Sequence, residues 1–336
     1  MPLAKDELST NAMGGSELMK YRMADELKAL GDDILEPFQI FVSRVQEELD
    51  PNKIKIYWHQ DLPEDPACDI LRDKGWEKFD YFVFNSAWQM QMFNLYHGVP
   101  YSRSMVLMNA IDPIEVGEKP KDTIRLIYHS TPHRGLELLV PVFEKLCETH
   151  NDIELDVYSS FKIYGWEERD KQYEQLFAKC KSHPKINYHG SVPNAEVKAA
   201  LAKAHIFAYP SIWIESSCIA LMEAMSAGLV CCHSNLGALI DTSGGITRMY
   251  QFDEDPSAHA TRFYGVLDQA IQDVRAGHSA AETQYVKFYA DNRFSWDRRS
   301  MEWKAFIKML LALKERGEMP RKQTGPVFVY NTNQRG

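Results

Sequence analysis

The sequence lacks the patterns by which metal and redox centres are usually recognised. It contains no HExxH motif, no DxD flanked by strands and no paired Cys/His spacing. Its six cysteines form no CxxC pair, and most of them stand in apolar surroundings. It also has no nucleophile elbow and no P-loop. We therefore expect no metal site and no cofactor, and we expect reduced core thiols, as in a cytoplasmic protein.

Targeting segments and a basic excess are also missing. The N-terminal stretch 1–8 has no signal-peptide hydrophobic region, and no apolar run approaches the roughly 18 residues that span a bilayer. With 38 basic and 47 acidic residues, the formal net charge is −9. This balance argues against a broad phosphate-backbone surface, and so against nucleic-acid partners, but it leaves room for a local basic pocket.

What the 336 residues do contain is an ordinary globular composition, with 45% hydrophobic and 25% charged residues. Short apolar runs alternate with helical stretches, which is typical of α/β units with parallel sheets. The expected strands are 38–42, 54–58, 81–85, 105–108, 124–128, 153–158, 186–188, 204–209 and 229–233. The expected helices are 17–30, one beginning after Ser86, 135–149, 170–181, 194–203, 217–227, 258–276, 280–289 and 296–314. A polar stretch with two prolines, 110–122, is the best linker between two domains.

The most informative stretch runs from Tyr209 to Gly228, where a buried strand turns into a helix. Ser216 or Ser217 is expected to cap that helix. A helix start beyond a strand presents free N–H groups and a positive dipole end, which suit a phosphate. Glu215 and Glu223 bracket this site. Two carboxylates around an anion site suit a ligand with hydroxyls on both sides of a diphosphate, as in a nucleotide sugar.

This stretch resembles the Glu-x7-Glu signature of the retaining GT-B glycosyltransferases of group 1, or family 4. The resemblance covers about residues 11–315 and implies an α/β fold of the GT-B kind, with two Rossmann-like, doubly wound domains facing a cleft. It also implies that Glu215 contacts the donor sugar, that Glu223 contacts the nucleotide ribose, and that the amides of Ser216, Ser217 and Cys218 hold the diphosphate. The competing interpretation makes Glu215 a solvated loop residue and Glu223 an exposed helix position.

The same resemblance divides the chain. Residues 1–115 would form the acceptor-side domain and 116–296 the nucleotide-sugar domain. In the family the last helix crosses back, so the helix at about 297–320 would complete the first domain. One departure stands out: family members usually begin with a strand that leads into a glycine loop. The dozen residues before Gly14 are too polar for one, so the first domain is reduced or borrows its missing strand.

Further site residues follow from the resemblance. Gly14 and Gly15 match the glycine loop, whose backbone approaches the donor phosphates. Arg134 opens a helix beside a glycine and would neutralise the diphosphate, with His129 and His133 as weaker candidates. An exposed loop arginine is the simpler alternative.

Two more positions belong to this set. His59 ends a strand where related enzymes place a histidine against the transferred sugar, although a histidine there is often only structural. Gly190 and Val192 match a turn whose backbone meets the nucleobase.

The expected activity is therefore that of a retaining, metal-independent hexosyltransferase. It would move a hexose-type sugar from a nucleotide diphosphate sugar to a hydroxyl of a glycan, lipid or small-molecule acceptor, with Glu215, Arg134 and His59 as catalytic residues. The alternatives are a sugar-nucleotide epimerase or phosphorylase on the same fold, and a non-catalytic nucleotide-binding partner subunit.

Overall fold

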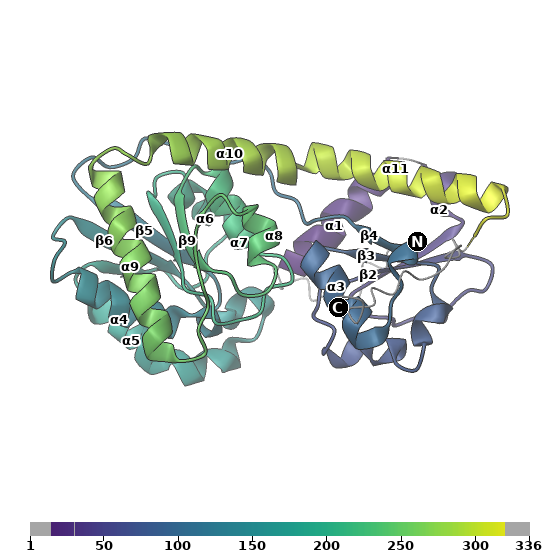
Figure 1. Ribbon diagram of the computed structural model, residues 1–336, viewed down its shortest axis with the longest axis horizontal. Coiled ribbons are helices and arrows are strands. Elements are labelled where there is room, and N and C mark those ends of the chain that lie inside the picture. Colours follow the sequence, from purple (N-terminus) through teal and green to yellow (C-terminus); the bar gives the residue numbers. More distant parts are fainter. Residues whose placement is uncertain (1–14, 30, 320–336) are drawn as a thin grey trace, which may run out of the picture.

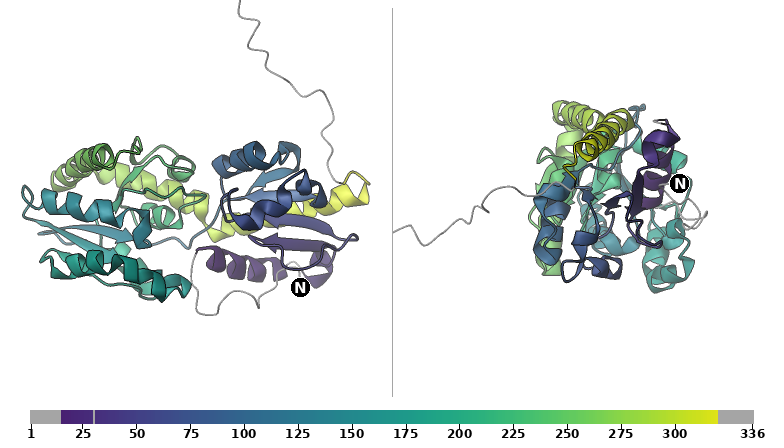
Figure 2. Two further views of the ribbon diagram at one scale, coloured as in Figure 1. Left: turned by 90° about the horizontal axis from the view of Figure 1, so that it is seen from below. Right: turned by 90° about the vertical axis from the view of Figure 1, so that its right-hand side faces the viewer.

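The structure is a computed structural model that describes residues 15–29 and 31–319. Two α/β lobes lie side by side, and two long successive helices cross them: α10 (Ala280–Phe294) lies along the second lobe and α11 (Trp296–Glu315) along the first (Figure 1). Figure 2 shows from below that each sheet lies between two layers of helices. Both sheets are entirely parallel, and most of their strands are buried apolar runs, as expected when helices cover both faces.

The first domain contains a four-stranded sheet in the sequential order β1-β2-β3-β4. Side chains alternate along each strand, so that Phe41 and Phe82 face an aromatic core under α3, while Ile40 and Trp58 face α1 and α11. The strands are β1 (Phe38–Val42), β2 (Ile54–Trp58), β3 (Tyr81–Phe84) and β4 (Ser104–Val106). The helices are α1 (Gly15–Lys28), α2 (Asp32–Leu35) and α3 (Ala87–His97), with 3-10 turns η1 (Pro66–Leu71), η2 (Gly75–Lys78) and η3 (Tyr101–Arg103).

Helix α11 belongs to the core of the first domain although it comes last in the chain. Trp303 is fully buried, and its ring lies 5.0 Å from that of Trp58 on β2. Ser300 donates a hydrogen bond of 2.8 Å to Glu26 of α1. The C-terminal helix therefore covers one face of a sheet that would otherwise expose large apolar side chains.

The second domain has a six-stranded sheet in the order β10-β9-β8-β5-β6-β7. The chain moves outward from β5 to β7 and then returns to β8 on the other side of β5. The order in which strands are added to the sheet therefore reverses between β5 and β8. In open α/β sheets, ligands bind outside the carboxyl ends of the strands at such a switch point.

The strands are β5 (Ile124–His129), β6 (Ile153–Tyr158), β7 (Ile186–Tyr188), β8 (Ile206–Tyr209), β9 (Val230–Ser234) and β10 (Arg248–Tyr250). The α-helices are α4 (Leu136–Leu146), α5 (Glu174–Ser182), α6 (Asn194–Leu201), α7 (Ile219–Ser226), α8 (Leu239–Ser243) and α9 (Pro256–Arg275). The 3-10 turns are η4 (Pro132–Arg134), η5 (Phe161–Tyr164) and η6 (Glu167–Tyr173).

Most expected elements are present, and two differ in an informative way. The helix expected from residue 170 begins as the 3-10 turn η6 and becomes α-helical only at Glu174. The helix expected from Ser217 begins at Ile219, and its N-cap is Cys218, not Ser216 or Ser217. The short elements α8 and β10 were not predicted, because three to five residues carry too little periodicity.

We predict that Trp303→Ala destabilises the first domain by about 3–5 kcal/mol, because it empties a large buried site against Trp58. Hydrogen exchange of β2 and β3 amides should accelerate, while the amides of β5 and β6 keep their protection. Met301→Ala is the matched control, since Met301 lies on the same helix and is 65% exposed. Equal acceleration in both domains would contradict the assignment of α11 to the first core.

Candidate active site

The site is built by two loops that follow the adjacent strands β5 and β8. Gly135 ends the first loop with φ +119°, and a Cβ there would lie 2.2 Å from the carbonyl oxygen of Pro210 in the second loop. Only glycine permits this conformation and this approach. Gly135 therefore lets the two loops touch at the switch point of the sheet.

Arg134, Glu215 and Tyr209 form the centre of the site. The Nη1 of Arg134 lies 2.7 Å from Oε1 of Glu215, and the Tyr209 hydroxyl donates to the same oxygen at 2.5 Å. Glu215 is only 3% exposed. Burial opposes the charge of Arg134, but Glu215 and its neighbours outweigh burial and hold the pKa of Arg134 above its usual range. Burial, and then Glu215, also raise the pKa of Tyr209. Glu215 is therefore a buried carboxylate with a fixed cation beside it, which excludes the solvated-loop interpretation.

The backbone of Glu215 is fixed as firmly as its side chain. It forms an isolated parallel bridge with Gly237, and its carbonyl accepts a hydrogen bond of 2.7 Å from the Ala238 amide. A Cβ on Gly237 would lie 2.6 Å from that carbonyl oxygen. The loop after β9 thus holds Glu215 in place through close backbone contact.

Glu223, the fifth residue of α7, faces the sheet and not solvent. It is 7% exposed, and its Oε2 lies 3.5 Å from Nε2 of His129, the last residue of β5. This burial excludes the interpretation of Glu223 as an exposed helix position. His129 was expected only as a weak candidate for the diphosphate, and its proximity to Glu223 was not predicted.

Several buried polar atoms around this centre have no hydrogen-bond partner within the described residues. They come from the ends of β5 and β6 and from the start of α7. They are His129 Nδ1 and Nε2, Thr131 Oγ1, His133 Nδ1, Arg134 Nε, Ser159 Oγ and Ser217 Oγ. Native proteins rarely leave buried polar groups without partners, so their concentration at a switch point indicates a polar ligand.

The first domain reaches the same loop from the opposite side. The Ser216 hydroxyl donates to the carbonyl of Gln60 at 3.0 Å, and the Ser86 hydroxyl donates to the carbonyl of Ser216 at 2.8 Å. The Trp88 amide, near the start of α3, donates to the Asp241 carboxylate at 2.7 Å. These contacts were not predicted. They explain why Ser216 does not cap α7: its hydroxyl is used between the domains.

The remaining expected residues lie on other elements than Arg134 and Glu215. Gly190, with φ +68°, and the half-buried Val192 follow β7, two strands away from β5. The ring of His189, beside Gly190, stacks 4.3 Å from Tyr158 at the end of β6. Gly15 is the first residue of α1, and Gly14 lies outside the described residues.

The expectation that His59 faces the cleft is wrong. His59 is 1% exposed, and its ring lies 4.0 Å from the rings of both Tyr57 and Phe93. Burial lowers its pKa well below the usual histidine range. Side chains alternate along β2, so the residue after Trp58 points to the opposite face, which is the aromatic core of the first domain. His59 is therefore a core residue.

Part of this sequence matches a known protein family. Residues 112–243 match the family described as glycosyl transferases group 1. The match relates this stretch to the group 1 glycosyltransferases. The stretch contains both loops of the site, from Arg134 to Glu223, together with the glycines that bring them together.

Curated proteins similar to the chain include two that act on phosphatidylinositol lipids by name. A phosphatidylinositol N-acetylglucosaminyltransferase subunit of Arabidopsis thaliana is 28% identical over 34% of the chain and 23% of its own length. The phosphatidyl-myo-inositol mannosyltransferase of Mycolicibacterium smegmatis is 24% identical over 62% of the chain and 51% of its own length. The chain thus spans about half, or less, of these relatives.

Solved structures extend the likeness to both domains. A glycosyltransferase from Rickettsia africae superimposes with a TM-score of 0.64 at 12% identity, covering 91% of this chain and 84% of that one. At this identity the likeness concerns the fold, and the fold is GT-B, with two Rossmann-like domains. Within residues 15–29 and 31–319, no helix is both long and apolar enough to cross a membrane.

The site predicts a specific response to acid. Burial, and then the charges of Arg134 and Arg169, lower the pKa of His133 to about 4. Unfolded His133 takes up its proton near pH 6.5. Between those values the unfolded chain binds more protons, so His133 removes stability as the pH falls from about 6.5 to about 4. We expect His133→Phe to lose less stability than the wild type over this range.

Urea unfolding at several pH values measures this difference. His278→Phe is the control, since His278 is exposed just beyond the end of α9, and it should follow the wild-type profile. If His133→Phe and the wild type lose stability in parallel, the histidine is not held neutral by the site.

Proposed function

We propose that this protein is a retaining glycosyltransferase that moves a hexose-type sugar from a nucleotide diphosphate sugar to an acceptor hydroxyl without a metal ion. One observation carries the proposal. At the switch point of the second sheet, half-buried Arg134 pairs with buried Glu215, and buried Glu223 lies near polar atoms that have no hydrogen-bond partner in the described chain. A nucleotide diphosphate sugar offers these atoms phosphate oxygens and hydroxyls.

The diphosphate would lie between Arg134 and the start of α7. Arg134 uses Nη1 for Glu215, while its buried Nε has no partner among the described residues and can donate to a phosphate oxygen. The amides from Ser216 to Cys218 lead into α7, whose dipole favours an anion. In this proposal Arg134 and the helix start supply the positive charge that a metal ion supplies elsewhere.

Glu215 and Glu223 would bind hydroxyls on either side of the diphosphate. Oε1 of Glu215 already accepts from Arg134 and Tyr209, so Oε2 is the oxygen that would accept from a hydroxyl of the donor sugar. Glu223 would accept from the ribose, with His129 beside it as a further hydrogen-bonding group. Gly190 and Val192 would border the nucleobase at the outer end of the site.

This environment favours a positioning role for Glu215 over a nucleophilic one, because a carboxylate paired with Arg134 and hydrogen-bonded by Tyr209 is a weakened nucleophile. Retention of the sugar's anomeric configuration then fits attack by the acceptor oxygen on the same face of the sugar from which the leaving group departs. The bond between the sugar carbon and the phosphate oxygen breaks, the acceptor oxygen bonds to that carbon, and the acceptor proton passes to the phosphate. Arg134 would stabilise the charge that develops on the leaving diphosphate.

A second candidate rests on the names of the relatives. The Arabidopsis protein is named as one subunit, which favours a role of this chain as the nucleotide-sugar-binding component of a larger transferase. Native mass measurement distinguishes the two: a chain that transfers sugar alone needs no partner, and an obligate hetero-complex supports the second candidate.

We predict that Arg134→Ala lowers sugar transfer by about 10²-fold, the usual loss when one charge-stabilising donor is removed. The assay follows nucleotide diphosphate release from UDP-, GDP- and ADP-sugars with a mixture of acceptors. Arg298→Ala is the control, because Arg298 pairs with Glu302 on the surface of α11, away from the site. Circular dichroism confirms that both variants fold.

The same assay separates the alternatives. An epimerase converts the nucleotide sugar without an acceptor and releases no nucleoside diphosphate. Normal transfer by Arg134→Ala would contradict the proposed role of the cation, and absence of any donor turnover by the wild type would contradict the proposed function as a whole.

A further inference from the structure

Three consecutive apolar residues project from the loop just before Glu215. Ile212, Trp213 and Ile214 are 44%, 45% and 40% exposed. The loop is held in shape, because the Ser211 hydroxyl donates to the Trp213 carbonyl at 3.0 Å and the Trp213 amide contacts the same hydroxyl at 3.3 Å. A fixed loop that presents large apolar side chains to solvent indicates a binding surface.

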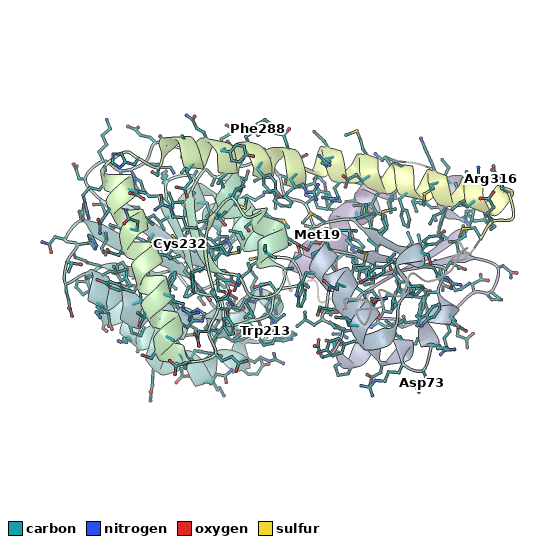
Figure 3. The ribbon with its side chains drawn as sticks, viewed as in Figure 1. Met19, Asp73, Trp213, Cys232, Phe288 and Arg316 are labelled. Atoms are coloured by element: carbon teal, nitrogen blue, oxygen red, sulfur yellow. The ribbon has the colours of Figure 1, made fainter. Side chains whose placement is uncertain are left out.

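The indole of Trp213 lies directly beside the candidate site. Its ring centroid is 4.6 Å from that of His133, nearly perpendicular to it, and His133 stacks at 5.1 Å on Phe161. His133 directly precedes Arg134 in the chain, so this aromatic group lies on the loop that also carries the Arg134–Glu215 pair. Figure 3 shows Trp213 at the edge of the second domain that borders the first.

The order of groups along this loop gives Trp213 a place relative to the donor. In the proposed arrangement the diphosphate lies toward Cys218, and the donor sugar lies at Glu215. Trp213 precedes Glu215 by two residues, on the side away from the diphosphate. Trp213 lies at a bend, and two residues of chain span at most about 7 Å, close to the width of a sugar ring. The group against Trp213 is therefore the next one beyond the donor sugar, which is the acceptor.

The polar atoms of the loop that contacts Trp213 through His133 indicate what kind of acceptor fits. His133 Nδ1 and Thr131 Oγ1 are buried and have no partner among the described residues. An acyl chain would leave both without hydrogen bonds, which is costly. A sugar ring offers an apolar C–H face to the indole and hydroxyls to the polar atoms. His133 is neutral at pH 7, since its pKa is lowered to about 4, so it can donate to or accept from a hydroxyl.

We propose that Trp213, with His133 beside it and Thr131 on the same loop as His133, forms an acceptor subsite that binds the apolar face of a carbohydrate ring, so that the acceptor is a glycan or glycoside. This inference rests on the proposed function, because it takes the donor sugar to lie at Glu215. It assigns to the second domain a part of acceptor recognition and makes Trp213 a determinant of acceptor specificity.

An array of defined neutral oligosaccharides, incubated with the labelled full chain, tests the proposal. We expect the wild type to bind a discrete set of glycans, and Trp213→Ala to weaken binding to the strongest of them by about tenfold or more. Trp213→Phe keeps an aromatic face and should retain most of the affinity. Phe288→Ala is the matched control, because Phe288 is an aromatic residue on α10 with 65% exposure, far from the loop in Figure 3.

Two parallel measurements make the outcomes distinct. Thermal shifts with nucleotide sugars report the donor site, and all three variants should keep the wild-type shift. A wild type that no nucleotide sugar stabilises would refute the proposed function, whereas the glycan results alone judge the subsite. Equal glycan binding by Trp213→Ala and the wild type would overturn the subsite, as would the absence of any glycan whose binding depends on Trp213. Trp213-dependent sedimentation with phosphatidylcholine vesicles, without glycan binding, would assign the loop to lipid instead.

Discussion

The interaction on which the site depends is the pair between half-buried Arg134 and buried Glu215. A carboxylate that is 3% exposed is stable only with a cation and hydrogen bonds around it, and here Arg134 and Tyr209 supply both. The pair also joins the loop after β5 to the loop after β8 at the point where the strand order reverses. Gly135 and Gly237 make this possible, because each removes a Cβ that would collide with the neighbouring backbone.

The same loop couples the site to the first domain. Ser216 follows Glu215 and is held by the carbonyl of Gln60 and the hydroxyl of Ser86, while Asp241 binds the amide of Trp88 at the start of α3. The domains are joined again by α11, whose Trp303 fills the core of the first sheet. A separation of the domains at the site would break the hydrogen bonds of Ser216 but leave the packing of α11 on the first domain intact. The loop that would hold the donor is therefore sensitive to such a movement.

The sequence predicts the fold well because strands that are buried on both faces are continuous apolar runs, and most strands of both sheets are such runs. It also names Arg134 and Glu215, which the structure pairs, and Glu223, which lies on the helix that follows the Glu215 loop. The errors concern side-chain direction and long-range contacts. His59 follows a strand, as a cleft residue would, but the sequence does not reveal which face of the sheet meets the aromatic core. Ser216 has the chemistry of an N-cap, yet partners more than 100 residues away in the chain use its polar groups.

His129 and Tyr209 illustrate a further limit of sequence patterns. Each is the last residue of a strand, and each contributes to the site because β5 and β8 are neighbours in the sheet. In the sequence, 76 residues separate the end of β5 from the start of β8. The signal that could have predicted how they contribute to the site is topological. Once β5 and β8 are recognised as the strands at the reversal, the polar residues at both carboxyl ends become site candidates.

The central claim is that a nucleotide diphosphate sugar binds where β5 and β8 end. A crystal structure of the protein with a bound nucleotide sugar tests it most directly. The account predicts diphosphate oxygens about 3 Å from the Arg134 guanidinium and from the amides that begin α7, with the sugar beside Glu215. A ligand bound elsewhere, with the surroundings of Arg134 and Glu223 unchanged, would contradict it.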